Sequence, residues 1–149
     1  MADNLHTGWA PETLSALAGQ RTVLVVDDEQ SVRELIAVIL ELDGHRVLQA
    51  DCGAAALAIA AAQHLDLITL DVMMSDLDGW EVAARLDADD RTAVVPRIMV
   101  SGRSPSTLAR ASGRARAAAV LGKPFDLAEF GAVVERLLAG PDHELADTA

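Results

Sequence analysis

Five polar residues follow short apolar segments of the sequence, at the points where those segments end. They are Asp27 and Asp28 after residues 22–26, Asp71 after 67–70, Ser101 after 96–100 and Lys123 after 118–121. Three carboxylates held close together repel one another, so ionising all of them requires either a cation or raised pKa values. Mg²⁺ or Mn²⁺ suits such a set, because these hard ions prefer oxygen ligands and leave coordination positions for water or phosphate.

The remaining two residues of the set are suited to phosphoryl oxygens, since Ser101 offers a hydroxyl group and Lys123 a point charge. The chemistry that uses all five is phosphoryl transfer to a carboxylate, with Asp71 as the nucleophile and the metal neutralising the developing charge. The single cysteine, Cys52, has no obvious base beside it and is not needed as a nucleophile.

These residues act together only if the chain brings their segments side by side. The apolar segments predict five strands, at residues 22–26, 45–50, 67–70, 96–100 and 118–121. The stretches between them predict helices at 32–40 with a stop at Gly44, then at 53–64, 78–86 and 105–116, and from 126 to the helix stop Gly140-Pro141. Strands that alternate with helices indicate a three-layer α/β fold with a doubly wound parallel sheet. The carboxyl ends of its strands share one edge, where such sheets bind ligands.

Several acidic residues have the positions of helix caps. Asp78 is expected to cap the helix that follows it. Asp126 and Glu129 have the spacing of a capping box, and Phe125 with Phe130 fits a hydrophobic staple across it. Asp76 is expected to serve in a turn or a cap rather than as a metal ligand.

The charge of the chain is uneven. The 149 residues hold 12 Lys and Arg against 23 Asp and Glu, a formal net charge of −11, which disfavours general binding to nucleic acid or to anionic membranes. Residues 91–125 hold basic residues and no acid. Five arginines there suggest a basic docking face for an acidic partner, with a solvated helix face as the alternative: Arg97, Arg103, Arg110, Arg114 and Arg116.

The chain has one cysteine and therefore no disulfide framework of its own. Neither a secretory signal nor an apolar stretch of about 20 residues is present, so we expect no membrane span and a cytoplasmic location.

In order and spacing, the polar residues resemble the receiver domain of bacterial two-component response regulators. The matching motifs are Asp27-Asp28, the block Asp71-Val72-Met73-Met74-Ser75-Asp76-Leu77-Asp78-Gly79, the hydroxyl of Ser101, and Lys123-Pro124-Phe125. The resemblance covers residues 21–139, with an N-terminal extension at 1–20 and an acidic C-terminal tail at 140–149. It implies the flavodoxin-like (βα)5 fold with strand order 2-1-3-4-5.

The resemblance also implies a role for each residue of the site. Asp71 would accept a phosphoryl group from the phosphohistidine of a sensor kinase. Asp28, Asp71 and the backbone carbonyl of Met73 would bind Mg²⁺, with Asp27 helping through water. Ser101 and Lys123 would hold the phosphoryl group, and phosphorylation would then shift the fourth strand and helix.

Four positions depart from or vary the family pattern. Ser75 stands where the family usually has Pro, so the loop after Asp71 is expected to be less rigid. Val120 stands where receivers often carry an aromatic residue that swings inward on activation. Met73 and Arg103 fall where the family tunes water access to the acyl phosphate, and we hypothesise that their bulk prolongs its life.

Only ten residues follow the last predicted helix, so we expect the output to be supplied in trans. It would be docking to a downstream protein or a phosphorelay through a histidine phosphotransfer protein, and a homodimer is left open. No enzyme activity is expected beyond self-phosphorylation from a donor and autodephosphorylation. One alternative is a phosphorylation-independent interaction module, which Val120 keeps open. The other is a Mg²⁺-dependent aspartyl phosphatase, disfavoured because Met73 stands where such an enzyme needs a second Asp.

Overall fold

A five-stranded parallel sheet forms the centre of the protein. The structure, a computed structural model, describes residues 20–102 and 118–148. Its strands are β1 (Thr22–Val26), β2 (Arg46–Ala50), β3 (Leu67–Asp71), β4 (Arg97–Ser101) and β5 (Ala119–Gly122). They lie in the order β2-β1-β3-β4-β5, which confirms the predicted strand order.

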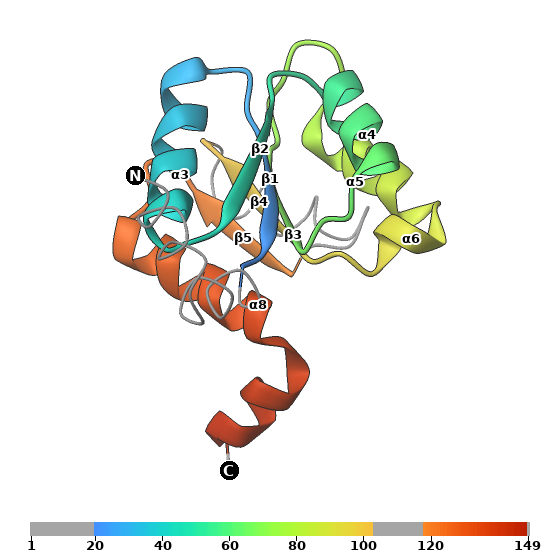
Figure 1. The fold of residues 1–149 in the computed structure, drawn as a ribbon. Coiled ribbons are helices and arrows are strands. Elements are labelled where there is room, and N and C mark those ends of the chain that lie inside the picture. The colour runs from blue at the N-terminus through green and yellow to red at the C-terminus, as the bar shows by residue number, and fades with distance from the viewer. Residues whose placement is uncertain (1–19, 103–117, 149) are drawn as a thin grey trace, which may run out of the picture.

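Helices cover both faces of this sheet (Figure 1). They are α3 (Gln30–Leu42), α4 (Gly53–Ala62), α5 (Gly79–Asp87), the short α6 (Asp90–Ala93) and α8 (Leu127–Thr148). One hydrophobic cluster joins alternate strand residues to α3 and α8, and a second joins the other strand residues to α4 and α5. Because successive strand side chains point to opposite faces, these two clusters are the two interfaces of a three-layer α/β fold.

The predicted capping roles of Asp78 and Asp126 are confirmed. Asp78 Oδ1 accepts a hydrogen bond from the Glu81 amide at 2.8 Å at the start of α5. Asp126 Oδ1 accepts from the Ala128 amide at 2.7 Å and the Glu129 amide at 3.2 Å at the start of α8. The rings of the predicted staple, Phe125 and Phe130, lie with centroids 5.4 Å apart.

The structure corrects two expectations about helices. The predicted stop at Gly140-Pro141 was wrong, since α8 runs through both residues to Thr148. A proline lacks one backbone donor, so it weakens and bends a helix without necessarily ending it. Helix α6 was not predicted, because four residues are too few to show the periodic spacing of apolar residues that indicates a helix. The helix expected at 105–116 lies outside the described residues.

Within the described part of the chain, no helix is long and apolar enough to cross a membrane.

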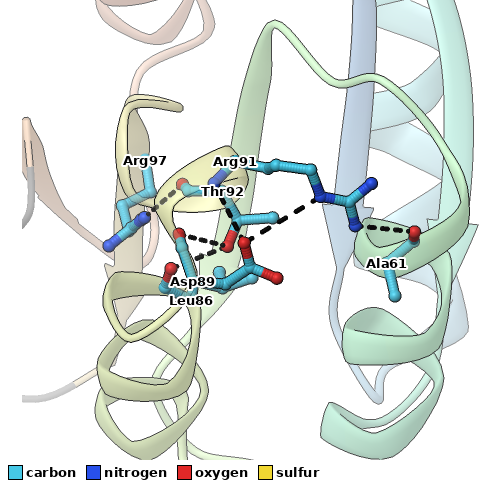
Figure 2. A network of polar contacts seen from close by, with 6 residues as sticks. All are labelled: Ala61, Leu86, Asp89, Arg91, Thr92 and Arg97. Atoms are coloured by element: carbon cyan, nitrogen blue, oxygen red, sulfur yellow. Dashed lines mark hydrogen bonds and ion pairs between the residues drawn. The ribbon is translucent and has the colours of Figure 1, made fainter.

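Arg97 was expected on a basic docking face, and this was wrong because its side chain is buried at the start of β4. Its guanidinium forms an ion pair with Asp87 and donates hydrogen bonds to the carbonyls of Ala83 at 3.3 Å and Thr92 at 3.0 Å. Figure 2 shows Arg97 directed at the Thr92 carbonyl, while the Thr92 hydroxyl donates to the Leu86 carbonyl at 2.7 Å. Arg97 therefore fastens β4 to the end of α5 and to α6. The other four arginines of that expected face lie outside the described residues.

Candidate functional site

The predicted site residues come from neighbouring strands that end at the same edge of the sheet. Asp27 directly follows β1, Asp71 is the last residue of β3, and Ser101 is the last residue of β4. The register pairs Val26 of β1 with Leu70 of β3, so the two aspartates that follow them are brought side by side. Val100 pairs with Asp71, which places the end of β4 on the other side of β3.

Three carboxylates gather at this edge. One oxygen each from Asp27, Asp28 and Asp71 lies within 4.8 Å of the others. Asp27 and Asp71 are buried, whereas Asp28 is exposed. The turn after β1 fixes Asp27, because its Oδ1 accepts a hydrogen bond from the Glu29 amide at 2.9 Å.

Lys123 meets this cluster from β5. Its ammonium nitrogen lies 2.9 Å from Asp27 Oδ2 and 3.5 Å from Asp71 Oδ1. Burial would lower the pKa of Lys123, but its hydrogen bond to Asp27 and the charges of Asp71 and Asp27 outweigh burial and raise that pKa. Lys123 is therefore a permanent positive charge among three acids. Three carboxylates and one ammonium sum to −2 when all are ionised, the charge that one divalent cation neutralises.

Asp71 is the acid of this group whose ionisation is made unfavourable by its surroundings. Burial, together with the charge of Asp27, raises its pKa from 3.8 to about 6, although Lys123 and the hydrogen bond from the Met73 amide act in the opposite direction. That amide lies 3.3 Å from Asp71 Oδ1. A carboxylate that burial and a like charge destabilise is one that a bound cation would stabilise most.

An open cleft of about 480 Å³ gives solvent access to these groups. Its lining is Asp28, Glu29, Asp71, Met73, Gly102 and Lys123. Glu29 and Gly102 were not predicted. Glu29 directly follows the acidic pair in the same turn, and Gly102 directly follows Ser101, so adjacency to a predicted residue was the signal available for both.

Two predicted residues lie behind this cleft and do not line it. Asp27 uses Oδ1 for the Glu29 amide and Oδ2 for Lys123, and it is 1% exposed. Ser101 is fully buried at the end of β4, where its carbonyl accepts a hydrogen bond from the Lys123 amide at 2.7 Å. This bond fastens the end of β5 to the end of β4, and so fixes where Lys123 leaves the sheet.

The two departures that fall within the described residues have different surroundings. Val120 lies in β5, is half-buried and packs against the hydrophobic cluster of α4 and α5. Ser75 is exposed in the loop after β3. Arg103 lies outside the described residues.

A second cleft, of about 550 Å³, lies at the opposite edge of the sheet, between the residues that precede β3 and those that precede β4. Arg91 lines it and donates a hydrogen bond to the Ala61 carbonyl at 2.9 Å, across from α6 to α4 (Figure 2). None of the predicted site residues is in its lining.

Comparison with known proteins agrees with this geometry. Residues 23–135 match the family model for the response regulator receiver domain. The chain is 35% identical over 120 residues to the DNA-binding dual master transcriptional regulator RpaA of Synechocystis, covering 80% of this chain and 50% of that protein. It is 30% identical over 118 residues to protein PilH of Pseudomonas aeruginosa, covering 79% of this chain and 98% of PilH.

Solved structures give the same result. The receiver domain of the sensor histidine kinase PA1611 from Pseudomonas aeruginosa, with a magnesium ion coordinated in its active-site cleft, matches with a TM-score of 0.75 and 25% identity. That match covers 81% of this chain and 99% of the other.

The chain belongs to the response regulator receiver family. A receiver domain is the phosphoacceptor module of two-component signal transduction, and this chain is such a domain. The chain spans about half or less of the length of several relatives, such as RpaA and the regulator PhoB, so their whole-protein activities do not carry over to it directly.

Proposed function

We propose that Asp71 is the phosphoacceptor of this receiver, and that Mg²⁺ or Mn²⁺ binds beside it. The carrying observation is the cluster of Asp27, Asp28, Asp71 and Lys123, which has a net charge of −2 when all four are ionised and which adjoins an open cleft. Asp28, Asp71 and the Met73 carbonyl would hold the ion, with Asp27 contributing through water. The ion would supply charge neutralisation for the transferred phosphoryl group.

Each step of the transfer then has a residue assigned to it. A carboxylate oxygen of Asp71 attacks the phosphorus of a phosphohistidine and forms the O–P bond as the P–N bond breaks. The imidazole leaves with the electron pair of that bond, and it is neutral because its other ring nitrogen already carries a proton. Lys123 faces the charge that develops on the phosphoryl oxygens, and it already lies 3.5 Å from the attacking carboxylate. The hydroxyl of Ser101, at the end of the adjacent strand, would bind another of those oxygens.

The proposed donor is a sensor histidine kinase or a histidine phosphotransfer protein in the cytoplasm. The proposed output is docking to a downstream protein in trans or further transfer of the phosphoryl group, with a homodimer as a second form of output. The proposed limits of the receiver are residues 21 and 139, with an N-terminal extension before them and an acidic tail after them. The only chemistry proposed for the chain itself is gain and hydrolysis of its own acyl phosphate.

Phosphorylation from a small donor tests this assignment. Wild type, Asp71→Asn and Asp78→Asn would be incubated with acetyl phosphate and Mg²⁺, and intact mass would be measured with and without EDTA. We expect one phosphoryl adduct on wild type and on Asp78→Asn, whose carboxylate caps α5, and none on Asp71→Asn or with EDTA. An adduct that persists on Asp71→Asn, or its absence from wild type, would contradict the assignment.

A further inference from the structure

Asp76 makes two hydrogen bonds that reach outside its own loop. It is an exposed residue in the loop between β3 and α5. Its Oδ1 accepts a hydrogen bond from the Gly53 amide at 2.9 Å, and its Oδ2 accepts one from the Ala54 amide at 3.0 Å. These amides belong to the first turn of α4, where backbone donors have no partner within the helix. The expected capping role of Asp76 is thus confirmed, but the helix that it caps is distant in the sequence.

Helix α4 has few other groups to satisfy its first turn. The residue at its N-cap, Cys52, accepts a hydrogen bond from the Ala55 amide at 3.4 Å through sulfur, a weak acceptor. The first turn of α4 contains no acidic residue. The carboxylate of Asp76 therefore supplies the negative charge that a helix N-terminus favours. Its hydrogen bonds to Gly53 and Ala54 lower the pKa of Asp76 to about 2, so this charge persists throughout the neutral range.

The loop and the helix also fit closely. A Cβ atom on Gly53 would lie 2.9 Å from Leu77 Cβ and 2.9 Å from Val82 Cγ2. Such distances are too short for carbon atoms, so the absence of a side chain at Gly53 is what lets Leu77 approach the start of α4. A polar contact at Asp76 and a steric contact at Leu77 thus hold the same stretch of loop against the same helical turn.

This loop carries Met73, whose carbonyl is a proposed ligand of the metal. Its base is closed by a hydrogen bond from the Gly79 amide to the Val72 carbonyl at 2.8 Å. On the inner side, the Met73 amide bonds to Asp71 Oδ1 at 3.3 Å. Further along the loop, the next polar side chain that hydrogen-bonds to another helix or strand is that of Asp76, which bonds to α4. The position of the Met73 carbonyl is therefore set between two anchors.

We propose that Asp76 is a positioning residue for metal binding, which holds the Met73 carbonyl in place by fastening the loop to the first turn of α4. The inference rests on the proposed function, since it takes the Met73 carbonyl as a ligand of Mg²⁺. Loss of a group that orients a metal ligand typically weakens metal affinity by about 10- to 100-fold. Asp76 lies three residues after Met73 along the backbone, so we expect the smaller loss of Mg²⁺ affinity, about tenfold.

Titration calorimetry with MgCl₂ would measure the Mg²⁺ Kd of wild type and three variants. Asp76→Ala removes both hydrogen bonds and should raise the Kd about tenfold. Asp76→Asn keeps one acceptor oxygen for the first turn of α4 and should give an intermediate Kd. Gly53→Ala changes no charge but pushes Leu77 off the helix, and it should raise the Kd as well. If the Mg²⁺ Kd rises in both Asp76→Ala and Gly53→Ala, the cause is the position of the loop. The loss of a negative charge cannot be the cause, because Gly53→Ala loses none.

Asp89→Ala is the matched control. Asp89 is an exposed aspartate that caps α6 through the Arg91 amide at 2.9 Å, at the opposite edge of the sheet. Its removal deletes the same charge and the same kind of cap, and should leave the Mg²⁺ Kd unchanged. Amide hydrogen exchange at Gly53 and Ala54 should accelerate in Asp76→Ala and not in Asp89→Ala.

The outcomes distinguish this inference from the proposed function. If wild type binds no Mg²⁺, the proposed function fails and the inference fails with it. If wild type binds Mg²⁺ and both Asp76→Ala and Gly53→Ala bind it with wild-type affinity while exchange at α4 accelerates, Asp76 only stabilises the helix, and the inference alone is overturned. A raised Kd in both variants supports it.

Discussion

The substitution Asp71→Asn is expected to stabilise the protein in the absence of metal. Asp71 is buried next to Asp27, and its ionised form is opposed by burial first and by the charge of Asp27 second. An asparagine has nearly the same shape, keeps an oxygen for the Met73 amide and for Lys123, and carries no charge. The unfavourable ionisation of the native state is therefore removed, while the hydrogen bonds to that oxygen are kept.

The size of this gain follows from the shift in the pKa of Asp71. Its rise from 3.8 to about 6 corresponds to about 3 kcal/mol at about 1.4 kcal/mol per pKa unit. Because the native state binds the proton more tightly than the unfolded state does, wild-type stability falls as pH rises. The loss begins near the unfolded pKa of 3.8 and is complete above about 6. Below pH 3.8 Asp71 is protonated in both the native and the unfolded state, so its ionisation no longer destabilises the native state.

Urea unfolding of wild type and Asp71→Asn between pH 4 and pH 8, in buffer with EDTA, would measure this difference. We expect Asp71→Asn to be more stable by about 3 kcal/mol at pH 7.5, and by much less at pH 4. Mg²⁺ at a hundred times its Kd should stabilise wild type by about 2.7 kcal/mol and so nearly close the gap. It should stabilise Asp71→Asn less, because that variant lacks one carboxylate ligand.

Asp78→Asn serves as the control, because it removes an exposed carboxylate from the same loop and asparagine caps helices about as well as aspartate. It should show no gain in stability at high pH. The reasoning about Asp71 would be refuted if Asp71→Asn were no more stable than wild type at pH 7.5. A gain of the same size at pH 4 and pH 8 would refute it equally, since the effect would then not depend on ionisation.

Four further substitutions have definite expected outcomes. Gly79→Ala should destabilise the protein by more than about 2 kcal/mol in thermal or urea unfolding, because its Cβ would lie 2.4 Å from the carbonyl oxygen of the last residue of β3. Gly131→Ala in α8 meets no atom within 4 Å and should stabilise by about 0.5–1 kcal/mol. Arg97→Met should cost about 3 kcal/mol, because it removes a buried guanidinium together with its ion pair to the partly exposed Asp87 and its hydrogen bonds to two carbonyls, and an Arg97→Met, Asp87→Leu double variant should recover part of that loss. Met73→Asn should shorten the half-life of the acyl phosphate, measured by intact mass after donor removal, because Met73 lines the cleft with half of its surface exposed.

The fold could be predicted from the sequence because its strands end abruptly in polar residues. Val26 to Asp27 and Leu70 to Asp71 are such boundaries, and each coincides with a strand end in the structure to within one residue. In a parallel sheet these ends share an edge, so the site residues could be grouped without knowing any distance. The same logic could not give the pairing of Lys123 with Asp27, whose separation of 96 residues leaves no local signal.

Other features depend on tertiary contacts that no local pattern contains. Arg97 belongs to a stretch rich in arginine, and arginines are mostly exposed, so a surface role was the reasonable expectation. Its burial depends on Asp87 and on two helix carbonyls that the fold alone brings near. The helix that Asp76 caps was equally out of reach, because its partners precede it by more than 20 residues.

The charge of the site explains why it suits a switch. With three ionised carboxylates and Lys123 it holds −2, and a divalent cation brings it to zero. Phosphorylation then replaces the single charge of Asp71 by about 1.5–2 negative charges, so the neutral site becomes negative by up to one unit. Among the residues that the structure describes, Lys123 is the one cation of this cluster, and in the resting state it is shared between Asp27 and Asp71. Attraction of Lys123 to the phosphoryl group must compete with its 2.9 Å hydrogen bond to Asp27. Because the Lys123 amide is bonded to the Ser101 carbonyl, a shift of Lys123 would pull on the joined ends of β5 and β4, which is where a charge change at Asp71 can become a change of shape.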